Sequence, residues 1–540
     1  MGHLLFVLAL VGFLSPVPIG ILLVGLHLFG WPVWRDLLPQ ARESLRGLSL
    51  SRGAVLTIAA GVLLAPFLLL PLYPPATFDS TMYHLPYAKA FAASGGMPFL
   101  PDLRFPVFPQ LMEALFAGML LFADDTATQL LQVLATLLTA GLVLVWGREA
   151  FGRAAGWLAA GIYLGNPLVT YFAGTAYVEP GLSLFATAAL FAFRRWRRSS
   201  KPVWLDLAAV FAASAAATKY LGLFFVLAIG LILLFTPAPP GRARHALRFA
   251  AIASAFLLPC YGRIFLLTGN PVFPYFSRLF GASAWDLSRL EPGTISPVSV
   301  LTLPWDLVFR RETFGWHPPI SPAYLLALPL MLFAAARARG IRRLLLLAAA
   351  YVLPALTLPR DPRYFLPILP LLSVAAAGAL LVLPFLRRPV LAAAASVFLL
   401  LPGWLYVARH IRHLGPLPVT AEQRHGFLAR RLPVYPAIQY LNRTRGGSYC
   451  LYAFYAENMP YFAEGRFLGD WFGPASFEKT LAASATPEAL HRKLRALGAD
   501  HLLLVEGRAP PIRIEDPGFQ KLFRIVYSDP HARVFALAGR

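Results

Sequence analysis

Residues 54–73 read AVLTIAAGVLLAPFLLLPLY, and residues 78–91, which follow shortly after, read FDSTMYHLPYAKAF. The first stretch is long enough to cross a bilayer, because a membrane-spanning helix needs about 20 apolar residues. The second stretch predicts a polar loop that places Asp79 at a membrane surface. A carboxylate beside lipid is costly unless it has a partner or a function, so Asp79 is a candidate functional residue. A solvated loop acid is the alternative explanation.

The composition extends this pattern to most of the chain. Of 540 residues, 58% are hydrophobic and 14% are charged, with a mean hydropathy of +0.61, whereas soluble domains carry about a quarter charged residues. The sequence therefore predicts a polytopic α-helical membrane protein. The formal charge of +22 comes mostly from short arginine clusters between apolar runs. Such clusters are typical of cytoplasmic loops and argue against a nucleic-acid partner.

Apolar runs follow one another along residues 1–408. The run at 203–236 is about twice one span and predicts two helices with a turn near Thr218 and Lys219, so we expect about 11–12 membrane helices in all. The first run, residues 4–29, lacks the basic start of a signal peptide and is predicted to stay as a membrane helix. The other runs are 54–73, 127–146, 154–173, 178–193, 247–267, 323–336, 344–358, 364–386 and 389–408.

Arginine clusters alternate with loops poor in positive charge, which predicts the side of each loop by the positive-inside rule. Clusters such as 194–201 and 337–343 are expected in the cytoplasm. The large loops at 74–126 and 269–322 are expected outside, with the short turns that carry Glu179, Lys219 and Arg360. The sequence thus predicts a transmembrane domain over 1–408 in the plasma membrane and an extracytoplasmic domain over 409–540.

The C-terminal region has a different composition. Short β-rich runs at 448–455, 501–505, 523–527 and 532–537 alternate with helix-like stretches. Thr486 followed by Pro487 marks a helix start. We expect a small α/β domain. Cys260 lies in an apolar run and Cys450 in this domain, which suggests neither a disulfide nor a cysteine metal cluster.

Several charged residues fall in the external segments. An acid pair with a ring of cations is what a reaction on a lipid phosphate requires, because carboxylates take a proton or hold a divalent metal and cations neutralise the leaving phosphate. Each also has a structural explanation: Glu179 before Pro180 can open a helix, and Lys219 can snorkel to the interface. The candidates are Asp79, His84, Lys89, Arg104, Glu179, Lys219, Arg263, His317, Arg360 and Arg363.

Five stretches of the chain follow one another in a recognisable order: FDSTMYHLPYAKAF from Phe78, YVEPGL from Tyr177, ATKYLGL from Ala217, GRIFLLTGNPVFPYF from Gly262 and RYFLPILPLLSVAAA from Arg363. They resemble the successive signatures of the GT-C superfamily of polyprenyl-phosphate-sugar glycosyltransferases. Within it the chain is most similar to bacterial family 39 and RgtA/B/C/D-like members, which are relatives of protein mannosyltransferases and of the lipid A aminoarabinose transferase. The resemblance covers residues 54–386.

The resemblance implies a role for each matched residue. Asp79 is the general base on the acceptor hydroxyl, and Glu179 is the second acidic site. Lys219, Arg263 and Arg363 contact the donor phosphate, as Arg360 does in the same turn. A divalent metal ion held by Asp79 and Glu179 is the one cofactor implied. Many relatives carry two adjacent acids in this loop, whereas here Asp79 is followed by Ser80.

The implied reaction moves a sugar from a polyprenyl-phosphate carrier to a glycan, lipid or protein acceptor, with inversion, at the outer face of the membrane. Two alternatives stay open. One is a transporter or flippase of a lipid-linked sugar, and the other is a non-catalytic scaffold. Transporters often show internal repeats and polar groups near the bilayer midplane. Here no repeat is visible and the charges lie at the ends of spans, which favours the glycosyltransferase.

Overall fold

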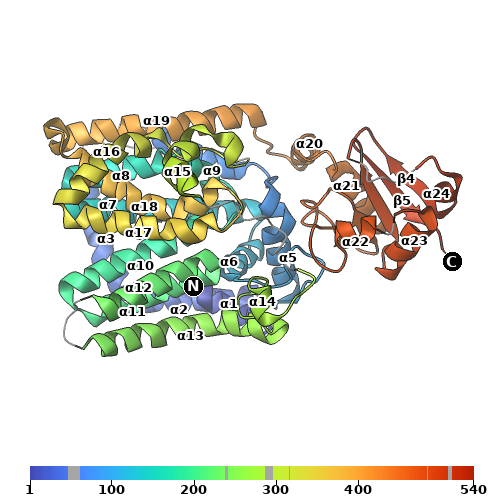
Figure 1. Ribbon diagram of the computed structural model, residues 1–540, viewed down its shortest axis with the longest axis horizontal. Helices are drawn as coiled ribbons and strands as arrows, with labels where there is room; N and C mark the ends of the chain where they lie inside the picture. Colours follow the sequence, from blue (N-terminus) through green and yellow to red (C-terminus); the bar gives the residue numbers. More distant parts are fainter. Residues whose placement is uncertain are drawn as a thin grey trace. The chain divides into compact units, whose positions relative to one another are not determined.

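The computed structural model describes residues 1–46, 61–236, 241–285, 296–315, 317–482, 484–508 and 514–539 (Figure 1). The chain divides into two compact units. The helical unit comprises Met1–Tyr73, Pro109–Cys260 and Leu290–Pro416. The sheet unit comprises Pro74–Phe108, Tyr261–Arg289 and Leu417–Arg540. The sequence-based boundary at residues 408 and 409 stays a prediction.

The helical unit is built from α-helices joined by short turns and 3₁₀ turns. Its first part contains α1 (Gly2–Leu10), α2 (Pro16–Phe29), α3 (Trp31–Arg46), the apolar helix Gly61–Leu72, α6 (Leu111–Leu120), α7 (Asp125–Phe151), α8 (Arg153–Leu164) and α9 (Pro167–Ala173). Its second part contains α10 (Glu179–Ser199), α11 (Pro202–Thr218), η3 (Tyr220–Gly222), α12 (Leu223–Phe235), α15 (Pro297–Phe309), α16 (Pro322–Arg337), α17 (Arg339–Leu356), η5 (Pro362–Ile368), α18 (Leu369–Leu380), η6 (Pro384–Arg387) and α19 (Pro389–Leu414). Helix α13 (Arg242–Thr268) begins in this unit and ends in the other.

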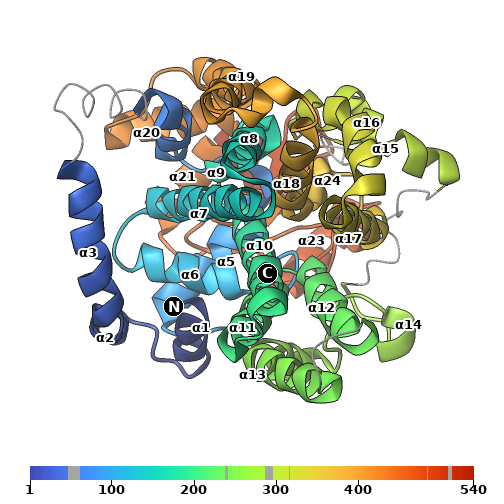
Figure 2. The same cartoon turned by 90° about the vertical axis from the view of Figure 1, so that its left-hand side faces the viewer.

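Helices α7, α8, α10 and α18 pack against one another, and Figure 2 shows them side by side within the bundle. Small residues allow the close approach, as is common between membrane helices. A Cβ on Gly156 would lie 2.7 Å from the carbonyl oxygen of Leu144, so α7 and α8 meet backbone to backbone there. On the other side of α8, the Gly403 N–H of α19 donates to the carbonyl oxygen of Gly165 at 2.8 Å.

Four described helices are long and apolar enough to cross a membrane, or five if a bent pair near the N-terminus counts as one span. This agrees with a multi-pass membrane protein, whereas the expected 11–12 crossings stay a prediction. The run at 203–236 forms two helices with a turn at Lys219, as predicted. The first run does not form one helix, because it breaks between Leu10 and Pro16. The start of the 54–73 run lies outside the described residues.

The sheet unit contains a five-stranded mixed sheet in the order β2-β1-β3-β5-β4. Strands β1 and β2 pair in parallel, as do β1 and β3, whereas β5 pairs antiparallel with β3 and β4. The strands are β1 (Cys450–Ala453), β2 (Arg466–Leu468), β3 (His501–Val505), β4 (Phe523–Ser528) and β5 (Ala532–Leu537). The helices are α20 (Ala421–Arg431), α21 (Tyr435–Arg445), α22 (Phe477–Leu481), α23 (Pro487–Ala496) and α24 (Pro517–Leu522).

The predicted small α/β domain is thus confirmed. Thr486 caps α23 as expected, because its side chain accepts a hydrogen bond from the Ala489 N–H at 3.2 Å. The pattern missed β2, which is only three residues long. The sheet unit also takes in the segment after Tyr73, where the expected polar loop is instead helical. It forms a π-helical turn, η2 (Ser80–His84), that leads into α5 (Leu85–Ser94).

Candidate functional site

Two cations from different turns meet at one carboxylate in the helical unit. The Lys219 Nζ lies 2.5 Å from the Glu179 Oε1, and the Arg363 Nε lies 3.9 Å from the same oxygen. The Glu179 side chain is 1% exposed, whereas the side chains of Lys219 and Arg363 are 23% and 13% exposed. The acid is therefore buried beneath two cations that can still reach solvent or a ligand. We call these three residues the Glu179 cluster.

Local structure explains why these side chains converge. Glu179 is the first residue of α10, with Pro180 following it, so the expectation that it opens a helix is confirmed. A carboxylate there is favoured by the positive end of the helix dipole. Lys219 follows the last residue of α11, and the tight turn at Gly222 starts the next helix. Arg363 lies in η5, whose start is capped by Asp361.

The Glu179 cluster continues into a second acid. The Asp361 Oδ2 lies 3.2 Å from the Arg363 Nε and 2.7 Å from the His317 Nδ1. The His317 ring packs against Phe172 and Tyr177, at centroid distances of 4.9 Å and 5.7 Å. His317 is therefore part of the network through Asp361. Sequence reasoning missed Asp361, although it stands in the RDPRY turn between two predicted arginines.

Asp79 lies in the sheet unit, in the first turn of the helical segment that includes η2. Its carboxylate is buried, and the Tyr83 hydroxyl donates to the Asp79 Oδ2 at 3.1 Å. Arg104 is close enough to interact with Asp79 electrostatically. Burial lowers the pKa of the Arg104 guanidinium, but the carboxylates of Asp470, Asp79 and Glu457 outweigh this and the pKa is raised.

The C-terminal domain supplies the other two acids of this group, which sequence reasoning missed. The Arg104 Nε lies 3.1 Å and 3.2 Å from the two oxygens of Asp470, and its Nη2 lies 2.9 Å from Oδ1. Burial raises the pKa of Glu457, and Asp470 adds to the rise, whereas Arg104 opposes it. We call Asp79, Arg104, Glu457 and Asp470 the Asp79 cluster. Three carboxylates share one guanidinium in it.

Three of the remaining candidates, Lys89, Arg263 and His84, contact other residues of the sheet unit. The Lys89 Nζ donates to the carbonyl oxygens of Tyr461 at 3.2 Å and Ala463 at 3.3 Å, and burial lowers the pKa of Lys89. The Arg263 Nη2 donates to the Met97 carbonyl oxygen at 2.9 Å. The His84 ring packs against Tyr83 at 4.1 Å. Arg360 lies in the helical unit, where it is exposed. In sequence it stands three residues before Arg363 of the Glu179 cluster.

The expected metal site stays a prediction. Asp79 and Glu179 belong to different units, and among the described residues no group of three His, Cys, Asp or Glu side chains could hold a metal ion. Each of the two carboxylates also lies near a cation, which weakens the negative potential that attracts a divalent ion.

The chain thus joins an apolar helical unit, with charged residues at helix ends, to a small mixed-sheet domain. Residues 105–261 match the family model described as dolichyl-phosphate-mannose-protein mannosyltransferase. A second family model, whose description names no activity, matches residues 423–536. No curated protein matches the chain in sequence.

Solved structures of ArnT show the same fold. ArnT from Cupriavidus metallidurans bound to undecaprenyl phosphate matches with a TM-score of 0.56 and 17% identity, over 90% of this chain and 99% of that one. The apo form of ArnT matches with a TM-score of 0.53 and 17% identity, over 91% of this chain and 100% of that one. The Archaeoglobus fulgidus oligosaccharyltransferase in complex with zinc and sulfate matches with a TM-score of 0.48 and 12% identity, over 88% of this chain and 73% of that one. The ArnT matches confirm the predicted GT-C fold, and the family segment supports the predicted glycosyltransferase class.

Proposed function

We propose that the protein transfers a sugar from a polyprenyl-phosphate carrier to a hydroxyl group of a glycan, lipid or protein acceptor. The reaction takes place at the outer face of the plasma membrane. The observation that carries this proposal is the Glu179 cluster, in which two partly exposed cations from separate turns are aligned by one buried acid. The fold shared with ArnT, which was solved with undecaprenyl phosphate, supports a donor of the same class.

In this proposal Lys219 and Arg363 bind the donor phosphate. Ammonium and guanidinium groups form charge-assisted hydrogen bonds to phosphate oxygens, which are stronger than neutral ones. Both cations also lie about equally close to the Tyr364 ring, at 5.2 Å from its centroid, which gives the pair a shared aromatic support. Glu179 acts as a positioning residue, because its carboxylate holds the cations without facing solvent.

Asp79 is the proposed general base. It accepts the proton of the acceptor hydroxyl while the acceptor oxygen forms a bond to the anomeric carbon of the sugar. The bond from that carbon to the phosphate oxygen breaks at the same time, and the electron pair leaves with polyprenyl phosphate. Lys219 and Arg363 stabilise the negative charge of the leaving group. A single displacement of this kind inverts the anomeric configuration.

The donor assignment is tested with Lys219→Gln in the purified full-length protein, using a polyprenyl-phosphate sugar as donor. Losing one charge-assisted contact, worth about 1.5–3 kcal/mol, should raise the donor KM by about 10- to 150-fold. Lys201→Gln is the matched control, because Lys201 precedes α11 whereas Lys219 follows it. An unchanged donor KM in Lys219→Gln would contradict the assignment.

The base assignment is tested with Asp79→Asn, which keeps the shape of the side chain. Loss of a general base should lower kcat by about 10²- to 10⁴-fold while the donor KM changes little. Asp206→Asn serves as control, since Asp206 only pairs with the exposed Arg248 on the helix surface. Turnover retained in Asp79→Asn would contradict the role. Movement of the lipid-linked sugar across vesicles without any acceptor would instead favour the transporter.

A further inference from the structure

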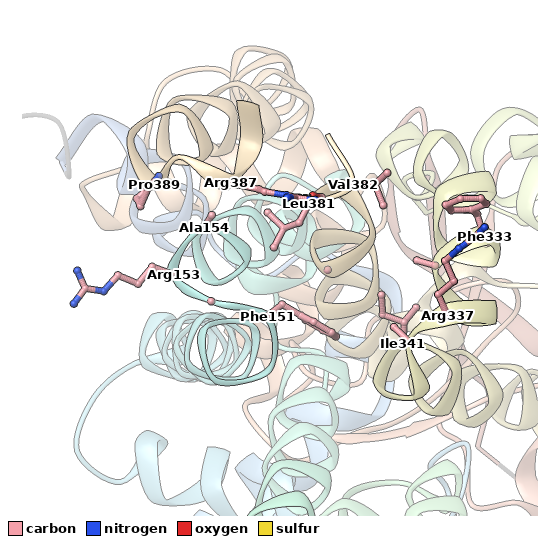
Figure 3. A pocket seen from close by; sticks show the side chains of 14 residues that line it. Phe151, Arg153, Ala154, Phe333, Arg337, Ile341, Leu381, Val382, Arg387 and Pro389 are labelled. Atoms are coloured by element: carbon pink, nitrogen blue, oxygen red, sulfur yellow. Dashed lines mark hydrogen bonds between the residues drawn. The ribbon is translucent and has the colours of Figure 1, made fainter. Parts of the chain in front are cut away.

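A cavity of about 550 Å³ lies in the helical unit where three pairs of helices turn (Figure 3). Helices α7, α16 and α18 end beside it, and α8, α17 and α19 begin beside it. The span Pro362–Leu380 carries Arg363 at its start and reaches the cavity at its end. Its seven 3₁₀ residues and twelve α-helical residues together extend about 32 Å. The cavity is therefore at the opposite end of that span from the Glu179 cluster.

The lining of the cavity combines an apolar interior with a cationic rim. Phe151, Ile341 and Leu381 are among its apolar residues, and Arg337 and Arg387 flank them. The Arg337 guanidinium lies 3.8 Å from the centroid of the Phe333 ring, and the Arg387 Nε donates to the Leu381 carbonyl oxygen at 2.9 Å. Both side chains are thereby held at the rim. No Asp or Glu is among the described residues that line the cavity.

Helix ends add to the positive potential. Helices α8, α17 and α19 begin at the cavity, and none of the three receives a side-chain hydrogen bond at its N-cap. The first N–H groups of a helix lack partners within the helix, and they carry a partial positive charge. Three such ends and three arginines, Arg153, Arg337 and Arg387, therefore lie beside a space with apolar walls. This chemistry suits an amphiphile with an anionic head.

We infer that this cavity binds the phosphate headgroup of an anionic phospholipid, with the start of an acyl chain against Phe151 and Leu381. Its place at the ends of apolar spans is where lipid headgroups lie. A basic pocket between membrane helices is a known form of anionic-lipid site. The inference does not depend on the proposed transferase mechanism, because none of the lining residues belongs to the Glu179 cluster or the Asp79 cluster.

The test is a lipid titration of the purified, delipidated full-length protein, followed by native mass spectrometry. Phosphatidylglycerol should bind at least about tenfold more tightly than phosphatidylcholine of the same acyl chains, because only the former lacks a cationic headgroup that the arginines repel. The double variant Arg337→Gln, Arg387→Gln should lose this preference. Arg244→Gln is the matched control, since Arg244 is an exposed arginine of α13 that does not line the cavity and should leave binding within twofold.

A second variant tests the apolar part of the site with the arginines intact. Val382→Trp places a large ring at the cavity and should weaken phosphatidylglycerol binding, while circular dichroism shows unchanged helix content. Equal binding of the two lipids to the wild-type protein would overturn the inference. So would phosphatidylglycerol binding that persists in the double variant. Displacement of the lipid by inorganic phosphate at equal concentration would also overturn it, because the site would then recognise a soluble anion.

Discussion

Glu179 orders two long, flexible side chains that would otherwise repel each other. Lysine and arginine side chains each have about 2 kcal/mol of rotamer entropy to lose when they are fixed. A buried carboxylate between them offsets the repulsion, so the cations are in place before a phosphate arrives. Glu179 then also competes with the donor phosphate for the same charges. Positioning of the cations raises kcat, whereas competition with the phosphate raises the donor KM. The two effects can therefore be separated kinetically.

Glu179→Gln should therefore lower kcat and leave the donor KM unchanged or reduced. Misplacement of the two cations should cost about 10²-fold in kcat, whereas removal of the competing anion favours phosphate binding. Glu179→Asp should restore part of kcat because it keeps the charge. Steady-state kinetics with varied donor give both constants. Glu149→Gln is the control, because Glu149 also holds two arginines, Arg194 and Arg195, away from the Glu179 cluster. A raised donor KM in Glu179→Gln would rule out this competition.

Glu457 gives a prediction about pH. Burial raises the pKa of Glu457 above its ordinary value of 4.5. Between the ordinary and the raised value the folded state binds more protons than the unfolded state, so stability falls as pH rises through this window. Glu457→Gln removes the dependence. The Tm of the wild-type protein should thus fall relative to that of Glu457→Gln as pH rises from 4.5, and a difference that is flat with pH would contradict the raised pKa.

At the scale of elements, the turn between α11 and α12 determines where Lys219 lies. The Gly222 N–H donates to the Lys219 carbonyl oxygen at 2.8 Å, and a Cβ on Gly222 would lie 2.1 Å from the Ala215 carbonyl carbon. The Ala215 backbone cannot move aside as a flexible side chain can. A side chain at this position must therefore push η3 away from the end of α11.

Gly222→Ala should destabilise the protein by about 1–3 kcal/mol through overpacking and should raise the donor KM by displacing Lys219. Gly230→Ala is the matched control, because Gly230 lies in α12 with nothing within 4 Å of a new Cβ. Alanine there should be neutral or stabilising by up to about 1 kcal/mol. Thermal unfolding and donor kinetics measure both effects. Equal behaviour of the two variants would show that the turn does not fix Lys219.

Elements with a length or capping signal could be predicted from the sequence. The double-length run implied the α11–α12 hairpin, and Thr486 with Pro487 implied the start of α23. Breaks inside apolar runs could not be predicted, because an apolar run has the same composition whether its helix is continuous or interrupted. The break before Pro16 and the π-helical turn at Ser80–His84 are of this kind. Strand β2 is too short for alternation to show.

At the scale of the whole molecule, the sequence could indicate which charged residues matter but not which of them meet. Lys219 and Arg363 were predicted as partners of one phosphate, and the structure places both on Glu179. Asp470 was not predicted at all, because it lies 366 residues from Arg104 and no local pattern links the two. Long-range pairing depends on how the chain folds back, which composition and periodicity do not encode.

Two Asp–Arg pairs join the segment after Tyr73 to the C-terminal domain, and they differ in burial. The side chains of Arg104 and Asp470 are 16% and 9% exposed, whereas those of Arg466 and Asp102 are 51% and 26% exposed. Removing one partner of a buried pair leaves an unpaired charge and costs about 3–5 kcal/mol. Exposed pairs contribute about 0–1 kcal/mol. The buried pair should therefore hold this segment on the domain.

Asp470→Asn should lower the free energy of unfolding of the sheet unit by about 3 kcal/mol, toward the lower end of the range for buried pairs because Arg104 keeps some contact with water. Asp102→Asn makes the same chemical change in the exposed pair and should cost under about 1 kcal/mol. Thermal unfolding and limited proteolysis of the full-length variants measure the difference. High salt should weaken only the exposed pair. If the two variants lose equal stability, the Arg104–Asp470 pair is not what attaches the Asp79 segment to the C-terminal domain.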